Sequence, residues 1–109
     1  MSRITTHILD TVLGKPAAGV MVRLERQEGG EWVTVSSGVT DQEGRCRDLC
    51  DEATAGRYRL AFQTGAYFIS AGRRSIYPEI AIIFACGEEP HYHLPLLLSE
   101  NSYTTYRGS

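Results

Sequence analysis

Short stretches in which apolar and polar side chains alternate recur along the chain and are separated by turn residues. In residues 20–27, apolar side chains fall on every second position, which predicts a strand with one buried face. The same criterion predicts strands at residues 4–10, 31–37, 45–49, 57–64, 79–86, 91–98 and 103–107.

One short helix is expected among these strands. Residues 65–71 follow Thr64, a residue type suited to the N-cap, and precede Gly72, which is suited to ending a helix. Seven to eight short strands with Gly-rich turns indicate an all-β fold, an antiparallel β-sandwich rather than an alternating α/β sheet. A chain of 109 residues has material for one core, so residues 1–109 are expected to form a single domain.

The strand at residues 91–98 carries apolar groups on both faces. Because strand side chains alternate, its two faces comprise Tyr92, Leu94, Leu96 and Leu98 on one side and His91, His93, Pro95 and Leu97 on the other. The face with the histidines is therefore expected to be covered too, by another subunit. Proline cannot donate to a β-ladder, so an edge position or a break is expected at that residue.

Charge and composition narrow the possible partners. The net charge is −2 and the 11 lysine and arginine residues are scattered, so neither nucleic acid nor an anionic membrane is an expected partner. No apolar stretch approaches the roughly 20 residues that cross a bilayer, and the first ten residues lack the order of a secretory signal. A cytoplasmic protein is expected. The three cysteines lack zinc-finger spacing and are expected to be reduced thiols.

Candidate chemistry centres on histidine. His91 and His93 stand two residues apart on one strand face, where two imidazoles can share a small substrate or a metal ion. His7 lies on the first predicted strand, and Arg45 follows a turn that gives its guanidinium a fixed starting point for binding an oxyanion. These residues allow a water-activating site, and each alone is also compatible with a solvated side chain of no special role.

Four segments together resemble one known family. They are Thr6-His7-Ile8-Leu9-Asp10 with Gly14-Lys15-Pro16-Ala17, Thr40-Asp41-Gln42-Glu43-Gly44-Arg45, the run from His91 to Ser99, and the terminal Tyr106-Arg107-Gly108-Ser109. In this order they resemble the transthyretin-like 5-hydroxyisourate hydrolases over essentially the whole chain. Transthyretins that carry thyroid hormone lack the terminal tetrapeptide and these histidines, so the resemblance favours the enzyme.

The resemblance implies a transthyretin-like sandwich assembled as a homotetramer, a dimer of dimers with active sites at the dimer–dimer interface. It implies hydrolysis of 5-hydroxyisourate to 2-oxo-4-hydroxy-4-carboxy-5-ureidoimidazoline in urate catabolism, with no metal or organic cofactor. The residues that match the family's catalytic positions are His7, Arg45 and His93. The expected substrate-binding residues are His91, Tyr106, Arg107 and Ser109.

Two other functions remain open on the residues alone. A transthyretin-type carrier would hold a small ligand without chemistry, although imidazoles and an arginine are of little use to an apolar ligand. A metallohydrolase would gather His7, His91 and His93 around zinc. Ligand binding without hydrolysis distinguishes the carrier, and loss of activity on chelation distinguishes the metalloenzyme.

Overall fold

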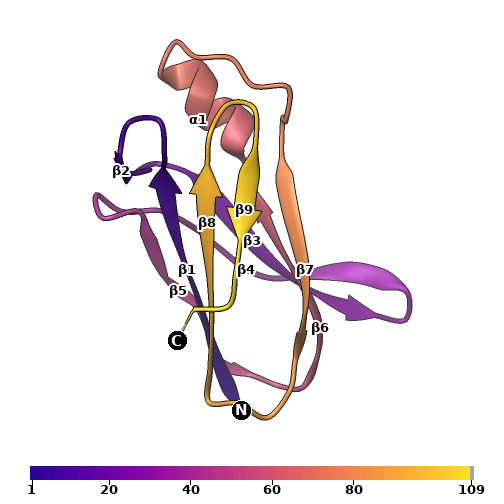
Figure 1. Ribbon diagram of the computed structural model, residues 1–109. Helices are drawn as coiled ribbons and strands as arrows, with labels where there is room; N and C mark the ends of the chain where they lie inside the picture. The colour runs from indigo at the N-terminus through magenta and orange to yellow at the C-terminus, as the bar shows by residue number, and fades with distance from the viewer. Residues whose placement is uncertain (109) are drawn as a thin grey trace.

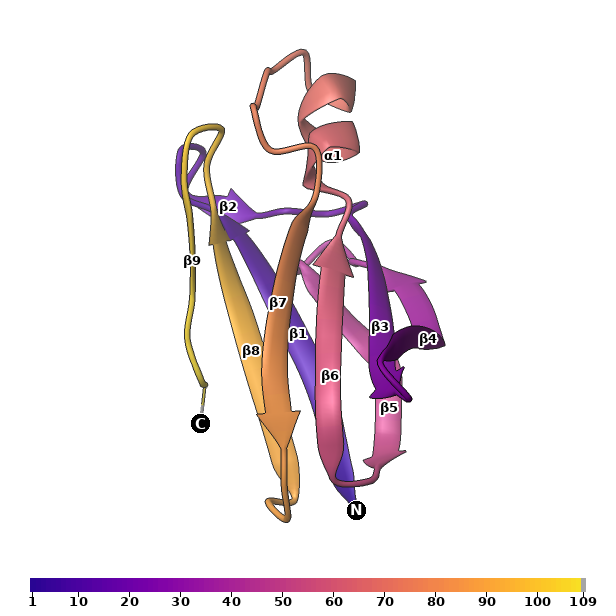
Figure 2. The ribbon, with the colours of Figure 1, turned by 90° about the vertical axis from the view of Figure 1, so that its right-hand side faces the viewer.

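The computed structural model, in which residues 1–108 are described except for the side chain of Asp48, forms two β-sheets packed face to face (Figures 1 and 2). The first sheet contains β1 (Ser2–Asp10), β2 (Lys15–Pro16), β5 (Arg45–Ala53), β8 (His91–Leu98) and β9 (Tyr103–Thr105). The second contains β3 (Met21–Glu28), β4 (Glu31–Val39), β6 (Gly56–Phe62) and β7 (Ile80–Cys86). The predicted all-β sandwich is confirmed.

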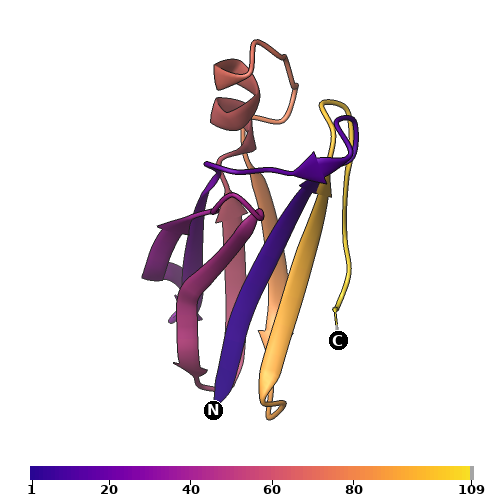
Figure 3. The same cartoon turned by 90° about the vertical axis from the view of Figure 1, so that its left-hand side faces the viewer.

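The first sheet contains a pairing that the predicted antiparallel arrangement did not include. β1 pairs with β8 in parallel along its length, while every other strand pair is antiparallel among the described residues. A parallel pair needs a long crossover connection, and here the second sheet and the helix lie between the two strands in the chain. Figure 3 shows β5, β1 and β8 side by side in this sheet. β1 thus joins two strands that lie far apart in sequence.

The core lies between the two sheets and consists of the inward-facing side chains. On β1, Ile4 and Ile8 are fully buried, as are Leu96 and Leu98 on β8. The facing sheet contributes Val22, Leu24, Leu60 and Phe62. Burying one such side chain is worth about 1.5–3 kcal/mol. This core fixes which residues of β1 and β8 point away from the second sheet.

The helix α1 (Thr64–Ser70) lies at the end of the sandwich near the β8–β9 turn (Figure 1). The prediction that Thr64 is its N-cap is wrong, because Gln63 holds that position and Thr64 is inside the helix with its hydroxyl buried and unpaired among the described residues. Gly72 ends the helix as predicted, with a φ of 70° and its N–H bonded to the carbonyl of Ile69. Within residues 1–108, no helix is long and apolar enough to cross a membrane.

Pro95 marks a break in the pairing of β8 with β9. The β9 ladder covers Leu96 to Leu98 and stops there, and the chain meets β8 again only at a single bridge between His93 and Gly108. The Thr105 hydroxyl donates to the Pro95 carbonyl between these two points. The predicted break is confirmed, and it lets the C-terminal tail leave the ladder and cross β8 (Figure 1), where Gly108 pairs with His93.

Candidate active site

Strand register brings the predicted catalytic residues onto one face of the first sheet. His7 on β1 lies directly opposite Arg45 on β5, and Thr5 lies opposite His93 on β8. Residues opposite each other in a ladder point to the same face, and residues two apart on a strand do so as well. His7, Arg45, His93 and His91 therefore share the face turned away from the second sheet.

The turn before β5 fixes the position of Arg45. The Asp41 carboxylate accepts hydrogen bonds from the backbone N–H groups of Glu43 and Arg45, at 2.9 and 3.0 Å. These bonds, the one from the Arg45 N–H above all, lower the pKa of Asp41. Gly44 has a φ of 76° and packs so closely on β1 that a Cβ would collide with the carbonyl oxygen of Ile8. The guanidinium of Arg45 thus extends from a rigid turn, as the sequence predicted.

His7 is held by the same turn. Its Nε2 lies 2.7 Å from the carbonyl oxygen of Glu43. Because a carbonyl oxygen only accepts, Nε2 of His7 carries a hydrogen and Nδ1 is the nitrogen available to other groups. The turn that precedes β5 therefore holds both His7 on β1 and Arg45 on β5.

The two histidines of β8 are joined by one threonine hydroxyl. Oγ1 of Thr5 lies 2.7 Å from Nε2 of His91 and 2.7 Å from Nδ1 of His93. The ring centroids of the two histidines are 6.0 Å apart. Burial, followed by electrostatic interactions with His91, Arg45 and His7, lowers the pKa of His93 below its usual value of 6.5. His93 is therefore a neutral imidazole at neutral pH.

A pocket of about 300 Å³ opens on this face, at the lower end of the range typical of small-molecule sites. It is lined by Arg3, Thr5, Thr6, Arg45, Cys46, Arg47, His91 and His93. Arg47 is paired with Asp41 and Glu43, whereas Arg45 makes no ion pair with any described side chain. The pocket thus contains the guanidinium of Arg45, which is available to a ligand, beside the imidazoles of His91 and His93.

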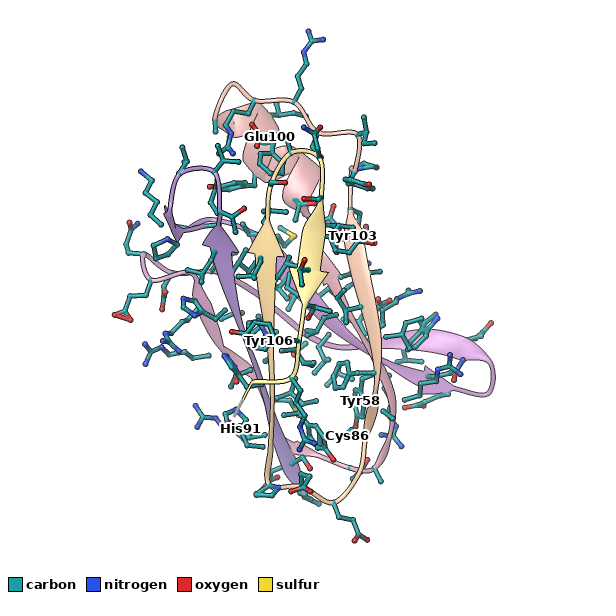
Figure 4. The ribbon with its side chains drawn as sticks, viewed as in Figure 1. Tyr58, Cys86, His91, Glu100, Tyr103 and Tyr106 are labelled. Carbon is teal, nitrogen blue, oxygen red and sulfur yellow. The ribbon has the colours of Figure 1, made fainter. Side chains whose placement is uncertain are left out.

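The C-terminal tail contributes unequally to this region. Arg107 lies over the ring of Tyr92 at 5.1 Å and lines a second pocket of about 410 Å³, which it shares with His91 and Gly108. Tyr106 is 52 % exposed and lines neither pocket. His91 and Tyr106 lie on the side of the sheet that the yellow tail crosses (Figure 4). The predicted residue Ser109 lies outside the described residues.

The three histidines are not arranged as a metal site. Among residues 1–108, no group of three histidine, cysteine or acidic side chains is placed to hold a metal ion. The Thr5 hydroxyl instead occupies the space between His91 and His93. His7 is directed to the Glu43 carbonyl and does not line the pocket.

Several residues of the site were missed by the sequence analysis. Thr5 and Thr6 read as ordinary strand residues, and Cys46 and Arg47 as part of a short strand. Their position became apparent only from the pairing of β1 with β5 and β8. Thr5 had one available signal, because its position two residues before His7 places both side chains on one strand face.

Known proteins with similar sequences belong to one family. The model of the HIUase/Transthyretin family matches residues 4–108. A 5-hydroxyisourate hydrolase from Salmonella dublin is 46 % identical, and the match covers 97 % of this chain and 80 % of that protein. The family assignment thus extends over essentially the whole sequence.

Solved structures give the same result. The 5-hydroxyisourate hydrolase of Klebsiella pneumoniae superposes with a TM-score of 0.91 at 44 % identity and covers both chains completely. Sea bream transthyretin in complex with thyroxine superposes with a TM-score of 0.92 at 35 % identity, covering 96 % of this chain and 93 % of that one. The fold is thus shared with both the hydrolase and the thyroxine-bound transthyretin, at nearly equal TM-scores. The chain belongs to the HIUase/Transthyretin family.

Proposed function

We propose that this protein is a 5-hydroxyisourate hydrolase that converts its substrate to 2-oxo-4-hydroxy-4-carboxy-5-ureidoimidazoline without a metal ion. The observation that carries the proposal is the convergence of His7, Arg45 and His93 from three adjacent strands onto one sheet face. The similar enzymes from Salmonella dublin and Klebsiella pneumoniae, both named 5-hydroxyisourate hydrolase, support the choice of substrate.

Hydrolysis of a cyclic amide-like bond requires three actions from the site. Water must lose a proton as it attacks the carbonyl, the resulting oxyanion must be stabilised, and the leaving nitrogen must gain a proton. His93 is suited to the first action, because its lowered pKa keeps the ring neutral and able to accept a proton. General base help of this kind is typically worth roughly 10² to 10⁴ in rate.

Arg45 and His7 supply the other two actions. Arg45 extends from a rigid turn and makes no ion pair with the described side chains, so its guanidinium is available to the oxyanion. The proton that His93 takes from water is passed to the leaving nitrogen, and His7 shares in this transfer through the lone pair of Nδ1, because its Nε2–H is bonded to the Glu43 carbonyl. His91, Tyr106, Arg107 and Ser109 close and orient the substrate site.

The proposal includes a homotetramer, a dimer of dimers located in the cytoplasm, with this face at the interface between dimers. In a single chain, the face leaves His91 and Tyr106 exposed and Leu9 and Leu97 only partly buried. Apolar and aromatic side chains left accessible on one sheet face are typical of surfaces that a second copy covers. A partner subunit would exclude water from the pocket and strengthen its electrostatic interactions.

The decisive assay follows the ultraviolet decay of 5-hydroxyisourate, made in place from urate by urate oxidase. The protein should accelerate this decay, and EDTA should leave the acceleration unchanged. Thyroxine binding measured by calorimetry provides the contrasting readout. A folded protein that binds thyroxine and leaves the decay rate unchanged would identify a carrier, whereas an acceleration abolished by EDTA would identify a metalloenzyme.

A further inference from the structure

The ring of His93 is held at two edges by groups outside the expected catalytic set. At one edge, Oγ1 of Thr5 contacts Nδ1 at 2.7 Å. Thr5 is only 7 % exposed, so water competes little for this bond. The same oxygen contacts Nε2 of His91, so a single hydroxyl serves both imidazoles.

The single hydroxyl of Thr5 makes the protonation pattern of one imidazole depend on that of the other. A threonine hydroxyl has one hydrogen to donate, so it cannot donate to both imidazoles at once. Nδ1 of His93 is engaged by this hydroxyl, so Nε2 is the ring nitrogen left to accept a proton from water. A neutral imidazole with its lone pair on Nε2 carries its hydrogen on Nδ1. The Thr5 hydroxyl then accepts from His93 and donates to His91.

At the other edge, the C-terminal tail packs directly on the imidazole. The N–H of Gly108 donates to the carbonyl of His93 at 2.8 Å. A Cβ on Gly108 would lie 2.6 Å from Cδ2 of His93 and 3.4 Å from Pro95. Contacts under 3.0 Å are essentially absent from real structures, so any side chain here must displace the ring or the tail. The glycine therefore lets the tail seat against His93.

We propose that Thr5 and Gly108 are positioning residues that hold His93 as the Nδ1–H tautomer in a single ring orientation. In this state, the lone pair of Nε2 is the one that accepts the proton of water. The catalytic consequence rests on the proposed hydrolysis, whereas the position of the ring proton is a property of the protein alone. The two can be tested separately.

The first test compares Thr5→Val with Thr5→Ser. Valine keeps the branched shape and removes the hydroxyl, while serine keeps the hydroxyl. Nitrogen NMR of the labelled protein at neutral pH should show His93 protonated at Nδ1 in the wild type and in Thr5→Ser. In Thr5→Val, the ring should shift toward the Nε2–H tautomer. The kcat of Thr5→Val should fall by roughly tenfold, as expected for one lost hydrogen bond, with KM nearly unchanged.

A matched control is Thr11→Val, which removes a hydroxyl that donates to the Leu98 carbonyl of the same strand β8 away from the histidines. This variant should keep both the tautomer of His93 and kcat. A His93 ring protonated at Nε2 in the wild type, or a Thr5→Val variant with wild-type tautomer and kcat, would overturn the role of Thr5.

The second test is Gly108→Ala, with Thr104→Ala as the control on an exposed residue of the same tail segment. The added methyl should displace the His93 ring, move its resonances and lower kcat by about tenfold, because a displaced base is misaligned with its proton. Thr104→Ala should change neither. Unchanged His93 resonances and kcat in Gly108→Ala would overturn the role of the glycine. The variants can also change the His93 tautomer as expected in a protein that does not accelerate 5-hydroxyisourate decay. That result would support the positioning roles of Thr5 and Gly108 and would refute the proposed function.

Discussion

At the scale of single residues, the environment of His93 sets the chemistry that the site can perform. Burial lowers its pKa first, and three neighbouring cationic or ionisable side chains add to the effect. A histidine that is neutral at neutral pH is a base ready to accept a proton. The pocket that surrounds it is rich in guanidinium groups, which suits an electron-rich substrate.

The pKa of His93 predicts how activity depends on pH. The base must be unprotonated, and its pKa lies below the ordinary value of 6.5. The midpoint of the acidic limb of kcat/KM for 5-hydroxyisourate should therefore lie below pH 6.5. Activity should be retained between that midpoint and neutral pH. A pH series of initial rates measures this. An acidic limb centred above pH 6.5 would contradict the lowered pKa.

Arg45 should contribute to the rate and little to stability. Removing a group that stabilises an oxyanion typically costs roughly 10² to 10³ in kcat, so Arg45→Ala should lose activity on that scale. The exposed Arg57 on β6 of the other sheet offers a matched control. Both variants should unfold at the wild-type temperature, and Arg57→Ala should retain wild-type kcat. Equal kcat in the two variants would remove Arg45 from the mechanism.

At the scale of elements, one buried carboxylate connects β1 to the helix and to the β8–β9 turn. Asp10 is fully buried at the end of β1, and its side chain accepts hydrogen bonds from Arg73 and from Tyr67 of α1. Arg73 also binds Glu100, which lies beside α1 in Figure 4. Burial raises the pKa of Asp10, but the hydrogen bonds together outweigh it and lower the pKa to about 2.

This network predicts a large cost for Asp10→Asn. Asp10→Asn removes the buried partner of Arg73 and leaves that guanidinium only the partly exposed Glu100 among the described residues, so the variant should lose about 3 kcal/mol in the free energy of unfolding. Urea unfolding at a fixed protein concentration measures the loss. Asp51→Asn is the control, because Asp51 is 84 % exposed and 3.9 Å from Arg3. A midpoint for Asp10→Asn equal to that of Asp51→Asn would contradict the account.

The same carboxylate also makes stability depend on pH. Its folded pKa of about 2 lies below the ordinary value of 3.8, so its stabilising contribution is complete above that value. The contribution should be lost as pH falls from about 3.8 toward 2. Urea midpoints across this range should decline more in the wild type than in Asp10→Asn, and parallel declines would contradict this.

Local patterning predicted most elements but not their pairing. The strand at residues 91–98 agrees with the structure, because alternation of side chains is a local signal. The Thr64 cap was wrong because tertiary packing buried its hydroxyl inside the helix. β5 extends to Ala53, beyond the predicted end at Leu49, because pairing with β1 continues there.

At the scale of the whole molecule, the site depends on a parallel pairing that no local signal carries. His7, Arg45 and His93 were named from the sequence by resemblance, yet Thr5 was not, because a threonine in a strand is unremarkable until β8 lies beside it. Side-chain alternation gives the face of a residue within its own strand. It does not predict which strand lies beside it in the sheet, and the site residues come from three adjacent strands.

The proposed assembly is also tested at this scale. The purified protein should elute with a mass about four times the 12.1 kDa of one chain in light scattering. Replacing Leu97, which is partly buried on the face with the pocket, by Arg should lower the mass and the activity together. A monomeric wild type with full activity would contradict the placement of the site between dimers.

The central claim is that His93 makes this member of the family an enzyme. The most direct measurement compares the decay of 5-hydroxyisourate with the wild type and with His93→Asn, both in EDTA and both confirmed as folded by circular dichroism. The wild type should accelerate decay. The rate with the variant should be lower by a factor of roughly 10² to 10⁴, which is the usual contribution of a general base. Equal rates in the two proteins would contradict the account.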